Sequence, residues 1–222
     1  MPDNTKPRVQ EPMWPSLIAM AAAGALHAVL PDHLALGPRW LVLAIVVALL
    51  VPGEVFHAVG KHSVCRVLGY IVISVVTIGM IGSVILLLRA IPNHEVAPLQ
   101  LLHSATALWV TNILVFAAWY WRLDAGGPHK RNMREDHTDG AFLFPQMTFD
   151  GPTDGSTDDK GDDKNWNPLF IDYLFLAFNT STTLSPTDVP VLSRWAKALM
   201  MVQATISLTV VGLLAARAVN IL

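Results

Sequence analysis

The chain has 222 residues, of which 53% are hydrophobic and 14% are charged, and its mean hydropathy is +0.46. This composition is typical of an integral membrane protein and excludes an ordinary soluble domain. A formal net charge of −2 gives no reason to expect a nucleic-acid partner. The single cysteine, Cys65, excludes an intramolecular disulfide and a cysteine-based zinc site.

Three apolar runs follow a polar, proline-rich tail, residues 1–13, which we expect to be disordered. The runs cover residues 16–30, 41–57 and 67–88, and the second is interrupted near its end by the sequence Pro-Gly-Glu. We expect them to form a three-helix membrane portion of the chain, residues 14–98.

The first apolar run has a second interpretation. Lys6 and Arg8 precede it, and small residues lie near its end, as in a signal peptide. The acidic residues and prolines of the tail do not suit the basic start of such a peptide, so we favour a membrane span.

A fourth apolar run, residues 99–121, ends in three aromatic residues that would lie at a water boundary of the membrane. Residues 123–166 then hold ten acidic and five basic side chains, so this hydrophilic acidic loop is the sizeable aqueous segment of the chain. The last apolar run, residues 192–222, is long enough to cross a bilayer with some tilt.

Between this loop and the last run, residues 167–188 predict a re-entrant helix. Asn167 suits a helix cap, and Pro168 suits the first helical position. The apolar stretch that follows has about a dozen residues, too few to cross a hydrocarbon layer of roughly 30 Å. It then gives way to hydroxyl residues and to Ser-Pro-Thr-Asp. Irregular backbone of this kind lies at membrane depth only where protein covers it or where it lines a water-filled cavity.

The sequence Thr-Thr-Leu-Ser-Pro-Thr-Asp-Val-Pro at 182–190 resembles the selectivity filter and following turn of potassium channels, Thr-Thr-Val-Gly-Tyr-Gly-Asp. Residues 173–178 resemble their pore helix and the chain from Arg194 their inner helix, so the resemblance covers residues 99–222. The whole chain also resembles a group of bacterial membrane proteins of uncharacterised function with a degenerate channel-like pore. The stretches that carry this second resemblance are 36–40, 116–121, 144–147 and 185–188.

The filter-like loop departs from the channel pattern. Ser185 and Thr187 stand where the channels have glycine, and Pro186 stands where they have an aromatic residue. The glycines allow successive carbonyl groups to face the ion, whereas proline fixes its own φ and restricts the residue before it. We therefore expect a weakly selective pore and not a potassium-selective cage. The filter-like residues are Thr182, Thr183, Leu184, Ser185, Pro186, Thr187 and Asp188.

Two interpretations remain open for these residues. Their hydroxyl groups could face ions or water, or they could bond back to the end of the half-helix and satisfy its carbonyl groups. Asp188 stands where the channels have an acid behind the filter, and a ring of four would attract cations. Its alternative role is that of an ordinary acid in a turn.

Five other polar residues are candidates. Arg194 and Lys197 begin the last run, where they would reach the interface or, around a pore mouth, repel cations or attract anions. His103 and Asn112 lie inside the fourth run, where polar side chains are costly unless paired; we favour interhelical hydrogen bonds for both. Asp172 lies in the first turn of the half-helix, where an acid stabilises the helix regardless of function.

The sequence carries no motif that indicates an enzyme, such as a phosphate-binding glycine loop or a nucleophile elbow. Its histidines do not have the spacing of a metal site. His129 and His137 lie in the acidic loop, where solvated charge is the favoured interpretation. We expect neither a metal nor a cofactor.

The sequence thus predicts an all-α integral membrane protein of five transmembrane helices and one re-entrant pore helix. The channel resemblance implies a homotetramer with its C-terminus in the cytoplasm; the basic residues of the loops do not fix the orientation. The expected partners are the lipid bilayer, monoatomic ions and further copies of the chain. The functional hypothesis is a weakly selective ion pore, and the alternative is a non-conducting scaffold or sensor. A transporter would need a second broken helix, for which residues 52–54 are a weak candidate.

Overall fold

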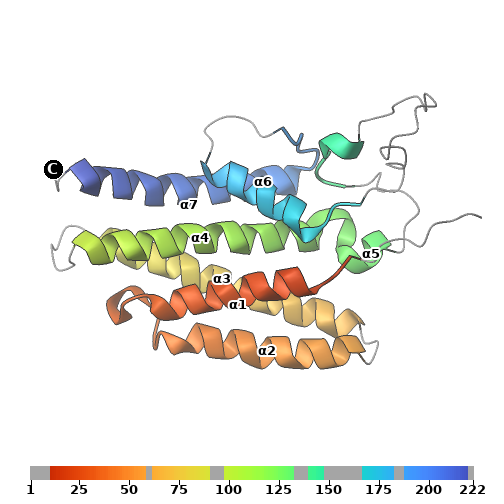
Figure 1. Cartoon of the computed structure of the whole chain (residues 1–222), viewed down its shortest axis with the longest axis horizontal. Coiled ribbons are helices and arrows are strands. Elements are labelled where there is room, and N and C mark those ends of the chain that lie inside the picture. Colours follow the sequence, from red (N-terminus) through yellow and green to blue (C-terminus); the bar gives the residue numbers. More distant parts are fainter. Residues whose placement is uncertain are drawn as a thin grey trace, which may run out of the picture.

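The computed structural model describes residues 11–58, 62–90, 98–132, 140–147, 167–182 and 188–219, and these residues are helical with short connections (Figure 1). Within them the β pairing is limited to one isolated bridge, between Phe142 and Val191. The all-α prediction is therefore confirmed. The helices are α1 (Trp14–Val29), α2 (Trp40–Ala58), α3 (His62–Ala90), α4 (Pro98–Leu123), α5 (Pro128–Asn132), α6 (Phe170–Thr182) and α7 (Arg194–Val219), and the 3-10 turns are η1 (Asp32–Leu34), η2 (Asp124–Gly126) and η3 (Pro145–Met147).

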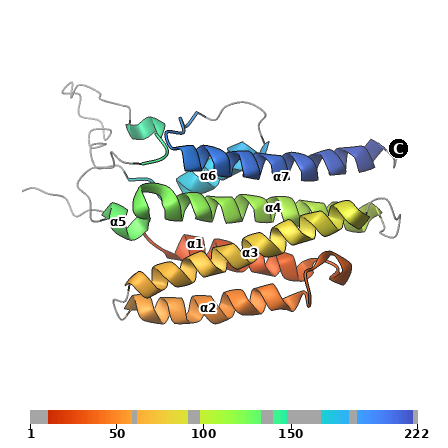
Figure 2. The same ribbon diagram turned by 180° about the vertical axis from the view of Figure 1, so that it is seen from behind.

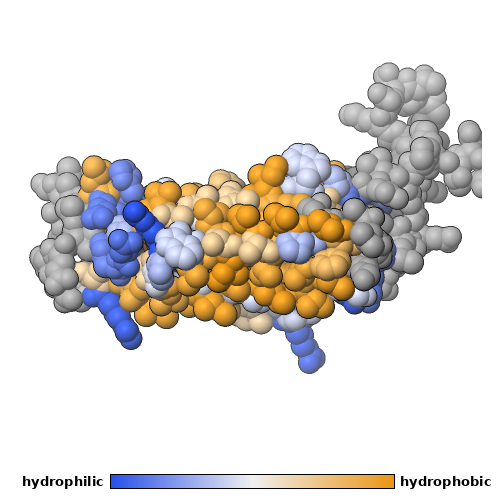
Figure 3. All heavy atoms as spheres, turned by 90° about the horizontal axis from the view of Figure 1, so that it is seen from below, coloured by the Kyte–Doolittle hydropathy of each residue, from blue (hydrophilic) through white to orange (hydrophobic). Residues whose placement is uncertain are grey.

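Three segments are long and apolar enough to cross a membrane: Ser63–Ala90, Leu99–Arg131 and Arg194–Ala216. The apolar stretches Trp14–Val29 and Trp40–Gly53 are shorter. On the face that Figure 3 shows, hydrophobic side chains cover the middle of the long axis, and hydrophilic ones gather toward the ends. The molecule therefore has the surface of a membrane protein.

Helix α4 is the centre of the arrangement. It packs against α1 and α3 on one side and against α6 and α7 on the other, while α2 lies beyond α1 and α3 (Figures 1 and 2). In the most apolar window of α4, 61% of the residues are buried, against 17% in the corresponding window of α7. Helix α7 thus lies at an edge of the molecule, with most of its apolar surface uncovered by this chain.

Three features differ from the sequence predictions. Helix α2 continues through Pro52, because proline inside a helix removes a single backbone N–H donor and the remaining turns stay bonded. The segment after α4 was expected to be a solvated loop, but Asp124, Arg131 and Phe142 are buried. Glu11, predicted to lie in a disordered tail, is buried as well. Much of the 123–166 segment, and residues 1–10, lie outside the described residues.

Close approach of α1 and α2 depends on Gly24. A Cβ atom there would lie 3.3 Å from Leu43 Cδ1 and 3.4 Å from Leu43 Cα, so a methyl group fits only if Leu43 shifts by a few tenths of an ångström, and a longer side chain does not fit. We predict that Gly24→Leu separates the two helices and costs about 1–3 kcal/mol of stability. Thermal unfolding in detergent measures the effect.

Gly24→Ala and Gly53→Leu are the controls, because nothing lies within 4 Å of a Cβ at Gly53. If all three variants unfold at the wild-type temperature, the α1–α2 contact is not as close as the structure shows.

Candidate functional site: the half-helix α6 and its buried polar supports

Helix α6 has 13 residues, or about 20 Å of rise, which is half the length of α7. It begins at the end of the molecule where α4 ends and where α7 begins, and it runs alongside both helices (Figure 1). Its first turn is capped by Asp172, whose Oδ2 accepts a hydrogen bond from the backbone N–H of Leu169 at 2.7 Å. The helix therefore begins two residues later than Asn167 and Pro168 predicted.

The far end of α6 lies near the middle of its neighbours. Ser181, its second-last residue, is bonded to Gln203 and Ser207, which are the tenth and fourteenth residues of the 26-residue α7. Ser207 is bonded in turn to Trp109, the twelfth residue of the 26-residue α4. Helix α6 thus stops half-way along both long helices, as the re-entrant interpretation requires.

Gln203 holds this far end in place. Its Nε2 donates to the carbonyl oxygen of Ala177 at 2.7 Å and to Ser181 Oγ at 2.8 Å, and its Oε1 accepts from the Tyr120 hydroxyl at 2.5 Å. The backbone oxygen of Gln203 accepts from Asn112 Nδ2 at 3.2 Å. All of these polar groups are buried, so the Gln203 side chain ties α4, α6 and α7 together.

Ser207 completes the support one turn further along α7. Its hydroxyl donates to the carbonyl oxygen of Ser181 at 2.7 Å and accepts from Trp109 Nε1 at 3.0 Å. A carbonyl group in the last turn of a helix has no partner within the helix. Here α7 supplies that partner in place of water.

A second network holds the beginning of α6. Tyr173, in its first turns, donates from its hydroxyl to Asp124 Oδ2 at 2.6 Å, and the N–H of Ala141 donates to Asp124 Oδ1 at 2.5 Å. Asp124 and Tyr173 are fully buried. The segment around Ala141 also bonds to the chain before α7: Leu192 N–H donates to its carbonyl oxygen at 2.8 Å.

Arg131 lies beside Asp124 and carries the positive charge of this network. Its Nη2 contacts Glu11 Oε2 at 2.8 Å in a salt bridge whose two side chains are almost fully buried. Its Nη1 donates to the carbonyl oxygens of Trp121 and Asp124, and its guanidinium lies 5.2 Å from the centre of the Tyr173 ring. Trp121 Nε1 donates to Glu11 as well. Glu11 thus fixes the start of the chain against the end of α4.

The predicted site residues fall into two groups. Of the filter-like residues, Thr182 and Asp188 are described and exposed, and 183–187 lie outside the described residues. The Thr182 hydroxyl donates back to the Phe178 carbonyl oxygen at 3.0 Å, and Thr180 donates likewise to Leu176. These hydroxyls therefore satisfy helix carbonyls, the second of the two interpretations.

The other polar candidates do not gather in one place. Asn112 is buried and makes the interhelical bond to Gln203, as favoured from the sequence, whereas His103 is exposed on α4 and makes no such bond to the residues that the structure describes. Arg194 and Lys197 are exposed at the beginning of α7. The described residues contain no group of three or more side chains that could hold a metal ion.

The sequence analysis missed the residues that carry the supports: Glu11, Asp124, Arg131 and Gln203. One signal was available, because Gln203 is a lone amide inside an apolar run, and such residues are functional or structural candidates by default. The charged residues gave no comparable signal, since they occur in segments that look solvated.

No family model matches the sequence, and no curated protein or solved structure shows significant similarity to it. The resemblance to potassium channels therefore rests on the sequence motifs named above.

We predict that Glu11→Ala leaves the Arg131 charge buried without its carboxylate and lowers the stability by about 3–5 kcal/mol. The matched control is Asp32→Ala, because Asp32 lies 3.8 Å from Arg39 in a pair whose side chains are 81% and 59% exposed. An exposed pair contributes about 1 kcal/mol or less. Thermal unfolding of both variants in detergent measures the difference; equal shifts would contradict a buried Glu11–Arg131 pair.

We predict that Gln203→Leu loosens the far end of α6. The change leaves the buried Tyr120 hydroxyl without its acceptor, at about 1–3 kcal/mol, and it removes the donor that Gln203 supplies to the Ser181 hydroxyl and to the Ala177 carbonyl oxygen. Hydrogen exchange followed by mass spectrometry should show faster exchange across residues 170–182. Thr205→Val is the control, since Thr205 is exposed on the same helix and bonds back to Met201. Unchanged exchange in Gln203→Leu would show that other contacts hold α6.

Proposed function

We propose that the chain forms a weakly selective ion pore by association of several copies, with α6 as the pore helix and the segment after it as the constriction. The observation that carries the proposal is that α6 ends near the middle of α4 and α7, held there by Gln203 and Ser207. In a membrane, a helix that ends at this depth would leave backbone groups unpaired in hydrocarbon, which is costly, and an ion pathway would account for such an end.

The direction of α6 favours cations. Its C-terminal end, which carries the negative partial charge of the helix dipole, points toward the middle of the molecule. An ion in a water-filled space there would meet the negative end of one such helix per copy. Asp188 is exposed and lies three residues before Val191, which pairs with Phe142 beside the Asp124 network at the beginning of α6; its charge would add to the negative potential at the mouth. Arg194 and Lys197 lie close by in the sequence and would act against it.

The uncovered face of α7 supports assembly. Four small or hydroxyl residues follow one another at helical spacing on its exposed surface, and small residues allow helices to approach closely in membranes. They are Ala198, Thr205, Gly212 and Ala216. A Cβ at Gly212 would meet nothing within 4 Å in the single chain, so a neighbouring helix has room to pack there. By the channel resemblance we propose four copies.

The proposed topology has five membrane-crossing helices, α1 to α4 and α7, with α6 entering and leaving at one end. The C-terminus lies in the cytoplasm, and α5 and the acidic segment lie outside. The non-conducting scaffold shares this architecture and differs in one respect: its constriction is sealed. A conduction measurement therefore separates the two functions.

The test is ion flux through purified protein in liposomes, together with a subunit count by native mass spectrometry in mild detergent. We expect tetramers that pass K⁺ and Na⁺ above empty vesicles and pass Cl⁻ less well. Asp188→Asn should lower cation flux several-fold by removing charge at the mouth. Asp32→Asn, an exposed acid in the turn between α1 and α2, should leave the flux unchanged.

Two outcomes would overturn the proposal. A stable monomer would contradict it, because one half-helix alone cannot surround a pore. A tetramer without flux of any of the three ions, across a range of voltages, would identify the protein as the scaffold.

A further inference from the structure

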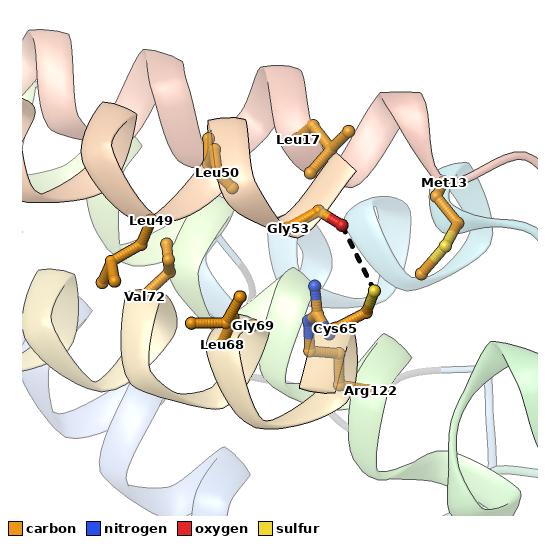
Figure 4. A pocket seen from close by; sticks show the side chains of 10 residues that line it. All are labelled: Met13, Leu17, Leu49, Leu50, Gly53, Cys65, Leu68, Gly69, Val72 and Arg122. Carbon is orange, nitrogen blue, oxygen red and sulfur yellow. Dashed lines mark hydrogen bonds between the residues drawn. The ribbon is translucent and has the colours of Figure 1, made fainter. Parts of the chain in front are cut away.

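A small pocket lies between α1, α2, α3 and α4, away from α6. It is lined by Met13 and Leu17 at the beginning of α1, by residues of the second half of α2, by the first turns of α3, and by Arg122 at the end of α4 (Figure 4). The pocket therefore lies toward the end of the molecule where α4 ends. The aliphatic lining residues are Leu17, Leu49, Leu50, Leu68 and Val72.

Arg122 is the one charged residue of this lining. Only 8% of its surface is exposed, and Figure 4 shows its guanidinium directed into the space beside Gly53 and Cys65. The guanidinium lies directly over Gly69, because a Cβ atom at that position would be 2.0 Å from Nη1. The absence of a side chain at Gly69 thus makes room for the arginine.

The guanidinium of Arg122 has no anionic partner among the residues that the structure describes. The guanidinium contacts the ring of the neighbouring Trp121, whose centre lies 5.5 Å from Arg122 Cζ. Arg131, at the same end of the molecule, shows the contrast: it has a carboxylate and two carbonyl oxygens. A buried charge without a partner is costly, so an anion from outside the chain would relieve that cost.

The enclosed space of the pocket is about 20 Å³, room for about one water molecule. We propose that the mouth of this pocket, and not the enclosed space, binds the headgroup of an anionic phospholipid, with the Arg122 guanidinium holding the phosphate. The planar guanidinium matches a phosphate group with two parallel hydrogen bonds. The aliphatic side chains from α1, α2 and α3 suit the beginning of an acyl chain, which a free phosphate ion does not have. Basic pockets between membrane helices on the cytoplasmic side bind anionic headgroups. The match of guanidinium and phosphate is the same at the outer end of the bundle, where the proposed topology puts this pocket.

The first measurement uses the wild-type protein alone. Cys65 lines the pocket and is the single cysteine of the chain, so its rate of alkylation by a small maleimide reports access to the pocket. In delipidated protein in detergent, we expect phosphatidylglycerol to slow this alkylation several-fold and phosphatidylcholine to leave it nearly unchanged. Equal protection by the two lipids would overturn the proposal. So would protection by inorganic phosphate at the same concentration, which would identify a small anion as the ligand.

The second measurement compares variants. Native mass spectrometry should show one phosphatidylglycerol retained per wild-type chain, with about tenfold weaker retention in Arg122→Gln. Arg66→Gln is the matched control, since Arg66 is an exposed arginine in the first turns of α3. Without lipid, Arg122→Gln should unfold at a temperature no lower than wild type, because it removes a buried, unpaired charge. Equal retention of phosphatidylglycerol by the two variants would overturn the proposal. If Arg122→Gln misfolds, the alkylation assay on the wild-type protein decides.

Discussion

The last carbonyl groups of a helix have no partner within it, and α6 ends beside the middle of two long apolar helices, where groups of the protein replace water as partners. Ser207 supplies a partner for the carbonyl oxygen of Ser181 in the last turn, and Gln203 donates to the Ser181 hydroxyl and to the Ala177 carbonyl oxygen one turn earlier. Because Gln203 also accepts from Tyr120, the same side chain fixes the distance between α4 and α7. The position of α6 therefore depends on two polar side chains of α7, a helix that is otherwise apolar and whose surface is mostly not covered by this chain.

The other end of α6 is held by a different kind of contact. Asp124 accepts from the Tyr173 hydroxyl, and Arg131 links Asp124 to Glu11, so charged residues from two distant parts of the sequence and a tyrosine from a third meet at one point. Such a network is stable only when each member is satisfied. Hydrogen bonds from the neutral amide of Gln203 hold the far end of α6. Hydrogen bonds that involve charged side chains hold its beginning, so α6 is fixed against α4 at both of its ends.

The sequence predicted the parts of the fold that depend on local pattern. The long apolar runs appear as α3, α4 and α7, and the short run followed by hydroxyl residues appears as the half-helix α6. What it could not predict are pairings between distant residues. Glu11 and Arg131 are 120 positions apart, and each alone looks like solvated charge. Gln203 could have been predicted, because it is a polar side chain inside an apolar run, which is the reason that Asn112 was singled out.

The lengths of the helices have a consequence for the surrounding bilayer. Helix α1 has 16 residues and rises about 24 Å, whereas α7 has 26 and rises about 39 Å, and the short helix lies on the opposite side of α4 from the long one. A hydrocarbon layer is about 30 Å thick, so α1 is shorter than such a layer and α7 is longer. Hydrophobic mismatch of opposite sign at two helices thins the bilayer beside the short helix, and it tilts the long helix or thickens the bilayer around it. In a membrane that both helices cross, bilayer thickness would act as a force on the tilt of this protein.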